Sequence, residues 1–358
     1  MEYGYYISNN RKIILDPGLG KLDLTIDQSN DITVIKCNKN LKSMLLKGSF
    51  SDPIRKIEIE LNENLEYLKL ERIFIKSLIL NEKLKELDCS FNQISNLKLN
   101  KDLKKLNCHY SQLRKLELNE NLIELDCSHN EISNLNLNKN LRILNCSINN
   151  LINLELNENL KKLKATCNNL KTIILNEKLE ELNISCNNLI EIELNENLKK
   201  LDVSGNKLKK IILNEKLEEL NVLSNNLTEI ELNENLKKLD AQNNKLKKII
   251  LNEKLEKLDA GYNNLNKIEL NKNLKKLDVS FNNLTELELN KNLKKLDVSD
   301  NNLEKIILTE KLEKLVISNR ENKNIQFNNS VNNSKVKIDY VVIPNQIIKS
   351  DGYGTLSI

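Results

Sequence analysis

Four cysteines recur at one fixed interval in the first half of the chain. Cys89, Cys108, Cys127 and Cys146 occupy every nineteenth position, and thiolates spaced in this way could form a metal or redox ladder. Zinc needs ligands that converge on a tetrahedron, whereas the side chains of a straight column cannot converge. Valine and alanine fill the same position in other units, which favours a column of small apolar side chains packed in a core. We therefore expect no metal and no cofactor.

The two histidines are the other candidates for chemistry. His109 and His129 fall at the ends of predicted strands, close in sequence to Tyr110, Ser111 and Ser128. A histidine acts as a catalytic base when it is paired with a nucleophile or an acid in a cleft. Serine recurs at the strand end of many units as a small polar filler, however, and no phosphate-cradling glycine loop, zinc-finger spacing or nucleotide fingerprint is present. The sequence therefore predicts no catalytic residue and no enzyme.

Apolar and aromatic residues interrupt the polar side chains that otherwise cover the predicted strands. Exposed clusters of this kind, surrounded by a polar rim, are typical of binding centres. The alternative is that they reflect drift in an older part of the repeat. The candidate partner-binding residues are Phe91, His109, Tyr110, Ile123, His129, Ile143 and Ile148, with a secondary patch at Tyr262 and Phe281.

Four lysines near the C-terminus form a further candidate site. Lys275, Lys276, Lys294 and Lys295 lack the glutamates that alternate with lysine pairs earlier in the chain. An unopposed basic stripe can bind the phosphates of a nucleic acid. Aspartates lie among these lysines on the same predicted strands and dilute the positive charge. Nucleic-acid binding is therefore an alternative, and a protein partner is preferred.

One internal repeat positions all of these residues. Leucine occupies every nineteenth position from Leu87 to Leu296 without an insertion, and the unit 255–271 reads L-x-x-L-x-A-x-x-N-x-L-x-x-I-x-L-N. The alternation of apolar and polar residues around Leu258 predicts a strand with one buried face. Stacked units would place their strands side by side in one parallel sheet, because no unit can bury its leucines alone.

Two columns of asparagine accompany the leucines. One follows each predicted strand, at Asn92 and at every nineteenth residue from Asn130 to Asn301, and Ser111 is the exception. An inward amide at this turn can satisfy backbone groups of adjacent coils. The second column, from Asn100 to Asn290, predicts the opposite corner of each coil.

The repeat pattern is that of leucine-rich repeats. It resembles the short-repeat class of that family, which includes the bacterial-effector type, over about residues 60–320, although Asn stands where that type usually has Pro. The resemblance implies a horseshoe or arc with one long parallel β-sheet on the concave face, and a role as an interaction scaffold. A unit this short leaves no room for a three-turn helix, so we expect a β-rich solenoid with an extended, largely non-helical convex face.

The ends of the chain depart from the repeat and predict caps. We expect an N-terminal cap with a degenerate repeat at residues 1–58, a leucine-rich-repeat solenoid at 59–318 and a C-terminal cap or tail at 319–358. No run of about 18 apolar residues occurs, so no membrane span is predicted. The N-terminus lacks a basic region followed by an apolar stretch, which favours an intracellular, cytoplasmic protein, or one delivered into a host cell by a parasite or virus.

Composition is consistent with a binding protein of no strong charge. The 55 basic and 51 acidic residues nearly balance, which argues for neither a nucleic-acid binder nor an enzyme of acidic substrates. The predicted function is a non-enzymatic protein–protein interaction scaffold that binds its partner on the concave face. A nucleic-acid-binding solenoid and a self-assembling structural repeat protein are the alternatives, and a monomer is favoured.

Overall fold

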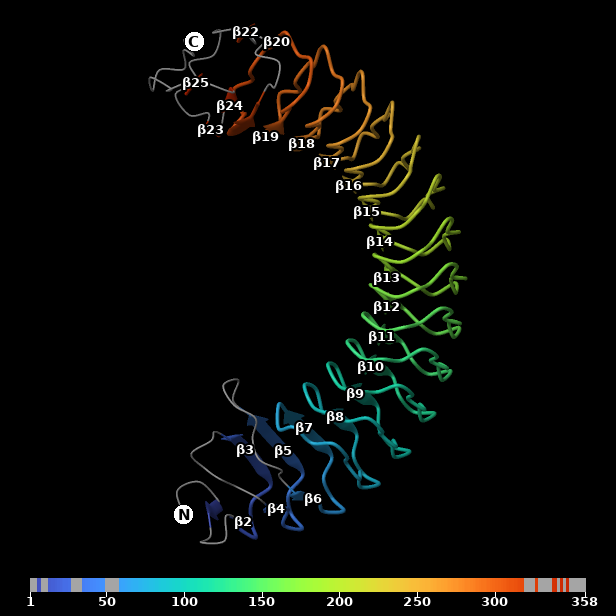
Figure 1. Ribbon diagram of the computed structural model, residues 1–358, viewed down its shortest axis with the longest axis vertical. Helices are drawn as coiled ribbons and strands as arrows, with labels where there is room; N and C mark the ends of the chain where they lie inside the picture. The colour runs from blue at the N-terminus through green and yellow to red at the C-terminus, as the bar shows by residue number, and fades with distance from the viewer. Residues whose placement is uncertain are drawn as a thin grey trace. The chain divides into compact units, whose positions relative to one another are not determined.

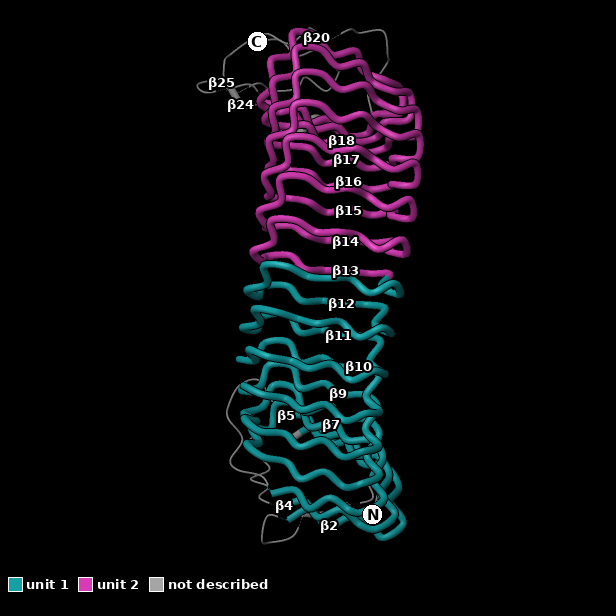
Figure 2. Tube along the Cα trace, turned by 90° about the vertical axis from the view of Figure 1, so that its right-hand side faces the viewer, with its two compact units in different colours: residues 1–179 teal, residues 180–358 magenta. Residues whose placement is uncertain are grey.

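In the computed structural model, residues 5–7, 12–26, 34–48, 58–318, 326–327, 337–339, 342–343 and 346–347 are described. The chain divides into two compact units, residues 1–179 and residues 180–358, which Figure 2 colours separately. Within the described ranges every regular element is a short β-strand, and no helix is present.

A parallel ladder of strands forms the first unit. From Leu68 onward each leucine lies opposite its equivalent one repeat later, whereas the earlier steps, from Leu22 to Met44 and from Met44 to Leu68, are longer. A smaller sheet contains β1 (Tyr5–Ile7), β2 (Lys12–Leu15), β4 (Val34–Lys36) and β6 (Glu58–Glu60). The ladder consists of β3 (Lys21–Ile26), β5 (Ser43–Gly48), β7 (Tyr67–Glu71), β8 (Glu86–Asp88), β9 (Lys105–Asn107), β10 (Glu124–Asp126), β11 (Ile143–Asn145) and β12 (Lys162–Lys164) (Figure 1).

The second unit repeats this register from Leu182 to Leu315, and its last step, from Leu315 to Ile338, is longer. Two short pairs follow it: β20 (Lys305–Ile306) with β22 (Gln326–Phe327), and β24 (Val342–Ile343) with β25 (Gln346–Ile347). Its parallel ladder consists of β13 (Glu181–Asn183), β14 (Lys200–Asp202), β15 (Glu219–Asn221), β16 (Lys238–Asp240), β17 (Lys257–Asp259), β18 (Lys276–Asp278), β19 (Lys295–Asp297), β21 (Lys314–Val316) and β23 (Lys337–Asp339).

Each coil buries one set of apolar side chains between the strand and an extended back segment. In the coil that contains β17, Leu255, Leu258, Ala260, Leu265 and Ile268 are all buried. Burying one leucine contributes about 1.5–3 kcal/mol, and each coil gains this only when its neighbours cover it. The predicted β-rich solenoid, with parallel strands on one side and a non-helical back on the other, is confirmed within each unit.

The predicted asparagine ladder is confirmed as well, and Asn263 shows how it works. Its side-chain amide donates to the carbonyls of Ala241, Ala260 and Gly261 at 2.9–3.1 Å. Its Oδ1 accepts the N–H of Leu246 in the preceding coil at 3.0 Å. The side chain thereby pairs backbone groups of two coils that would otherwise be buried without partners.

The second asparagine column lies at the opposite corner of the coils, as predicted. Asn271 donates to the carbonyls of Asn252 and Leu255 in the preceding coil, at 2.5 and 3.1 Å. Its Oδ1 accepts the N–H of Leu274 at 2.7 Å and so closes the turn that follows. The two columns together hold each coil to the one before it at both ends of the back segment.

Ser111 interrupts the first ladder, and its hydroxyl oxygen is buried without a partner among the described residues. We expect Ser111→Asn to raise the free energy of unfolding by about 1–2 kcal/mol, because the amide would face the Ile94 N–H and nearby carbonyls as its equivalents do. Urea denaturation followed by circular dichroism measures the change. Ser111→Ala, which supplies no amide, is the control and is expected to change little. A destabilised asparagine variant would show that this coil does not follow the ladder geometry.

Candidate partner-binding surface

A column of residues in the left-handed backbone region follows the strands. In every coil from residue 91 to residue 300, the residue just before the ladder position has a φ between 52° and 62°. Such values are uncommon for residues other than glycine, and more so for β-branched isoleucine. In the first unit the column holds Phe91, Tyr110, His129, Ile148 and Cys167, and the N–H groups of the first four each donate to a carbonyl of the next coil at 2.7–2.9 Å. The turn geometry therefore stacks these side chains coil upon coil.

Three members of this column and His109 form one continuous group of rings, named here the aromatic surface (Phe91, His109, Tyr110 and His129). The Phe91 and Tyr110 rings stack with their centroids 5.3 Å apart, and the Tyr110 and His129 centroids are 5.4 Å apart. The His109 ring meets Phe91 and His129 edge-on at 4.9 and 5.0 Å. These separations are favourable for aromatic pairs. Tyr110 is 54% exposed, so this surface offers a ring to a partner.

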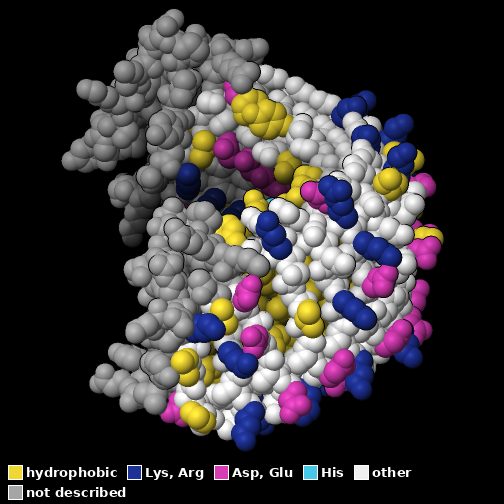
Figure 3. All heavy atoms as spheres, turned by 60° about the horizontal axis from the view of Figure 1, so that its bottom comes forward, with side chains coloured by type: hydrophobic (Ala, Val, Ile, Leu, Met, Phe, Trp, Pro, Cys, Tyr) yellow, Lys and Arg dark blue, Asp and Glu magenta, His cyan; other side chains and the backbone are white. Residues whose placement is uncertain are grey.

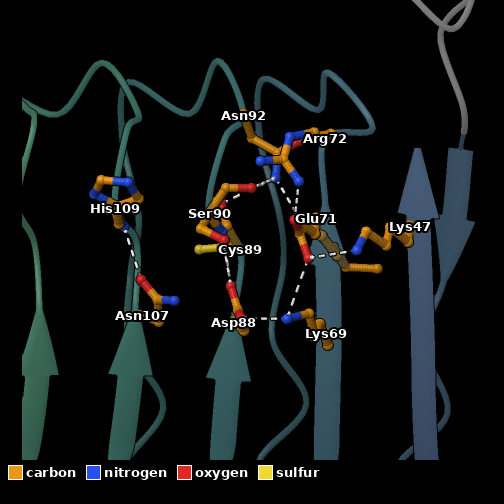
Figure 4. Close-up of polar contacts among 11 residues, drawn as sticks. Lys47, Lys69, Glu71, Arg72, Asp88, Cys89, Ser90, Asn92, Asn107 and His109 are labelled. Carbon is orange, nitrogen blue, oxygen red and sulfur yellow. Dashed lines mark hydrogen bonds and ion pairs between the residues drawn. The ribbon is translucent and has the colours of Figure 1, made fainter. Parts of the chain in front are cut away.

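Arg72 extends the aromatic surface by one coil, and sequence reasoning missed it. Its guanidinium carbon lies 4.1 Å from the centroid of the Phe91 ring, a cation–π contact. Arg72 also pairs with the buried carboxylate of Glu71, which Lys69 approaches at 3.2 Å and Lys47 at 4.0 Å (Figure 4). Its spacing in the sequence could have identified it, because Arg72 lies one repeat length before Phe91. The coil that contains Arg72, however, departs from the consensus.

A chain of hydrogen bonds holds the His109 ring. Its Nδ1 lies 2.9 Å from Oγ of Ser128, whose hydroxyl donates to Oδ1 of Asp126 at 2.5 Å. The serine proton is thus directed to the carboxylate, which leaves Nδ1 of His109 as a donor. Ser128 is buried, so its hydroxyl is neither activated by a histidine base nor open to a substrate. Burial lowers the pKa of His109, which keeps its ring uncharged at neutral pH.

The remaining residues of the predicted patch are divided between two places. Ile148 continues the left-handed column one coil beyond His129 and is exposed. Ile143 begins β11 and is also exposed, and Ile123 lies half-buried just before β10. The chain from Ile143 to Ile148 spans up to about 16 Å when extended. The structure therefore brings together the rings but places the two strand-start isoleucines at the other end of the strands.

Comparison with known proteins gives structural matches only. No family model matches the chain, and no curated protein matches its sequence. YopM from Yersinia enterocolitica WA-314 is 28% identical with a TM-score of 0.67, over 80% of this chain and 73% of that chain. YopM from Yersinia pestis, described as a leucine-rich effector protein, is 25% identical with a TM-score of 0.60, over 83% of this chain and 88% of that chain.

A third structure, the functional domain of InlJ from Listeria monocytogenes, is 24% identical with a TM-score of 0.68 and covers 83% of this chain and 66% of that chain. These matches agree with the in-register leucines and the buried asparagine ladder. This chain is a leucine-rich-repeat protein. Its repeats are of the short kind, and the described ranges hold no helix capable of crossing a bilayer.

The InlJ domain is described as including a cysteine ladder, and this leucine-rich-repeat protein has a column of cysteines of its own. Cys89, Cys108, Cys127 and Cys146 are completely buried, and burial raises the pKa of each thiol. They pack in the core as small apolar side chains. Within the described residues, no group of three or more His, Cys, Asp or Glu side chains could hold a metal ion.

The other two predicted sites lie in the second unit. The rings of Tyr262 and Phe281 stack with centroids 4.0 Å apart and planes 12° from parallel. Ion pairs engage two of the four basic-patch lysines, because Lys275 lies 2.9 Å from Glu256 and Lys294 lies 3.0 Å from Glu313. Lys276 and Lys295 are adjacent in register on β18 and β19. Charges of both signs are also interspersed over the face shown in Figure 3.

Proposed function

We propose that this leucine-rich-repeat protein is a non-enzymatic scaffold that binds another protein through the aromatic surface. The carrying observation is that Phe91, His109, Tyr110 and His129 form one connected group of rings with Tyr110 more than half exposed. Exposed clusters of this kind are rare on surfaces that contact only water. Arg72 and Ile148 border the rings and belong to the proposed contact.

The contacts within the aromatic surface favour binding because they fix the rings in advance. Each ring contacts at least one other ring, and the hydrogen bond between Nδ1 of His109 and Oγ of Ser128 orients the imidazole. The rings of this chain therefore lose little side-chain entropy when a partner covers Tyr110, and tyrosine is enriched among the residues that dominate interface energies. Ile123 and Ile143 form a second contact in this proposal, for a partner long enough to cover both ends of the strands.

Affinity capture followed by measured binding tests the proposal. Partners are captured from a lysate with and without nuclease at two salt concentrations, and the captured protein is titrated against purified variants by calorimetry. Tyr110→Ala is expected to weaken binding by about 30-fold or more, which is the effect of removing a central interface residue. The added change Ile143→Asp is expected to weaken it further.

Asn243→Ala is the matched control, because Asn243 occupies the same left-handed position in the second unit, is also exposed and belongs to neither candidate patch. It is expected to leave binding unchanged. Equal affinity for the wild type and the Tyr110→Ala/Ile143→Asp variant would overturn the proposal. Capture that disappears with nuclease, or on changing Lys275, Lys276, Lys294 and Lys295 to Glu, would favour a nucleic-acid partner instead.

A further inference from the structure

Two kinds of back segment alternate in the second unit, on the side of the coils opposite the strands (Figure 1). Residues 190–194 and 228–232 read I-E-I-E-L and T-E-I-E-L, and are named here the glutamate segments. Residues 209–213 and 247–251 both read K-K-I-I-L and are named the lysine segments. The third residue of each segment faces inward, whereas the charged residues are exposed. Acidic and basic segments therefore follow one another along the back, one for each coil.

Ion pairing differs between the two sides of these coils. On the strand side, opposite charges of neighbouring coils pair: Lys199 lies 2.9 Å from Glu180, and Lys238 lies 2.9 Å from Glu219. On the back, within the described ranges, no ion pair joins any charged residue of the glutamate and lysine segments. Those residues are Glu191, Glu193, Lys209, Lys210, Glu229, Glu231, Lys247 and Lys248. The back charges are thus arranged in segments of opposite sign but are not used to hold the coils together.

The lysine segments also expose isoleucine. Ile212 is 73% exposed and Ile250 is 69% exposed, although each follows an isoleucine that is buried in the core. The two isoleucines occupy the same place in alternate coils. Contact with another surface would remove their apolar area from water, which is favourable. The back of residues 190–251 therefore combines unpaired charge with uncovered apolar surface.

We infer that the back of residues 190–251 binds the same surface of a second copy of this chain, with the two stacks of coils antiparallel. A two-fold axis between the segments 209–213 and 228–232 places each of them opposite the other in the partner copy. The same axis places the glutamate segment 190–194 opposite the lysine segment 247–251. Every acidic segment then meets a basic one, whereas a symmetric parallel pair would oppose like charges.

The pairing is self-complementary over four consecutive coils, which is why a second copy fits it. It also covers Ile212 and Ile250 at the edges of the charged contacts. Exposed ion pairs are individually weak and are screened over about 8 Å at physiological ionic strength, so the association is salt-sensitive. A dimer of this kind differs from the monomer expected from the sequence, and its contact includes no residue of the aromatic surface.

Charge exchange on the back tests the inference by sedimentation equilibrium at low and high salt. The acidic variant carries Lys209→Glu, Lys210→Glu, Lys247→Glu and Lys248→Glu; the basic variant carries Glu191→Lys, Glu193→Lys, Glu229→Lys and Glu231→Lys. The wild type is expected to dimerise at low salt and to dissociate at high salt. Each variant alone is expected to be monomeric, and an equal mixture of the two is expected to form a heterodimer.

A variant with Lys257→Glu, Lys275→Glu, Lys276→Glu and Lys295→Glu changes the net charge as much as the acidic variant does, but on the strand side, and is expected to dimerise as the wild type does. Ile212→Ser with Ile250→Ser is expected to weaken the dimer without a change of charge. A wild type that stays monomeric at low salt and high concentration would overturn the inference. A dimer that survives in both back variants would overturn it as well, because it would use another surface.

Discussion

Asn263→Ala is expected to lower the free energy of unfolding by about 2–4 kcal/mol in the coils around it. The carbonyls of Ala241, Ala260 and Gly261 each keep a second donor when the amide is removed. The N–H of Leu246, by contrast, loses the Oδ1 that it donates to in the wild type. A buried N–H without a partner costs about 1–3 kcal/mol, and lost amide bonds add to this. Hydrogen exchange followed by mass spectrometry measures the loss coil by coil.

The residue next along the chain provides a matched control. Asn264 is exposed, and its backbone N–H donates to the Leu246 carbonyl at 2.9 Å, a bond that Asn264→Ala preserves. We expect that variant to exchange like the wild type. Because coils of a solenoid interact with their nearest neighbours, the Asn263→Ala effect should be largest in residues 241–282 and fade beyond them. Equal effects of the two substitutions would mean that the ladder amides do not contribute more than surface asparagines.

The repeat made most of the fold predictable. Leu258 and Ala260 have equivalents in phase in every unit, so one interpretation of the strand applies to every coil, and an error in it would have appeared at every repeat. The asparagine columns were predictable for the same reason, because a polar residue kept between leucines must satisfy buried backbone groups. Periodic sequences convert local patterns into long-range contacts directly.

The candidate site was less predictable because it depends on where the repeat is broken. Spacing placed Phe91 and Tyr110 in one column, but the ring contacts depend on the left-handed turn at these residues, which their residue types do not favour. Arg72 was missed because its coil has the spacing of the repeat but not the consensus residues. Ile143 was grouped with Ile148 because both interrupt the polar side chains that cover the predicted strands, although extended chain separates them.

Four consecutive aspartates on the strand face, named here the acidic ladder, are another interruption of the repeat pattern. Asp240, Asp259, Asp278 and Asp297 lie directly opposite one another on β16 to β19. In earlier coils of this column asparagine neighbours aspartate, and Asn145 donates to Asp126 at 2.8 Å and Asn183 to Asp202 at 3.2 Å. The ladder lacks these donors. Burial, together with Asp278 and Asp240, raises the pKa of Asp259 to about 6.

Asp259→Asn is therefore expected to raise the free energy of unfolding at pH 7.5 by about 1–2 kcal/mol. A pKa raised from 3.8 to about 6 sets an upper limit of about 3 kcal/mol, which screening by water at the strand face reduces. The new amide could donate to a neighbouring aspartate, as Asn145 does. Urea titration at pH 7.5 measures the gain, and Asp259→Ala separates loss of charge from gain of a donor. A less stable asparagine variant would contradict the expectation.

Lowering the pH is expected to stabilise the coils around Asp259 and to destabilise the coils around His109. Because the pKa of Asp259 is higher in the folded chain than in the unfolded one, its stabilising effect is full below pH 3.8 and is lost as the pH rises through about 6. The pKa of His109 is lowered by burial, so the coils around it lose stability as the pH falls below 6.5. Between pH 7.5 and 5, Glu218 and Glu256 stay ionised, because bonds from lysines lower the pKa of each.

Hydrogen exchange at pH 7.5 and 5, corrected for intrinsic rates, should therefore change in opposite directions in the two units. On acidification, peptides covering residues 240–297 are expected to gain protection and peptides covering residues 105–129 to lose it. Asp259→Asn should reduce the gain in the first group and leave the second unchanged. A loss of protection in both groups of the wild type would contradict this expectation. It would show that folding does not disfavour the ionised form of the aspartates of β16 to β19, as on a solvated surface.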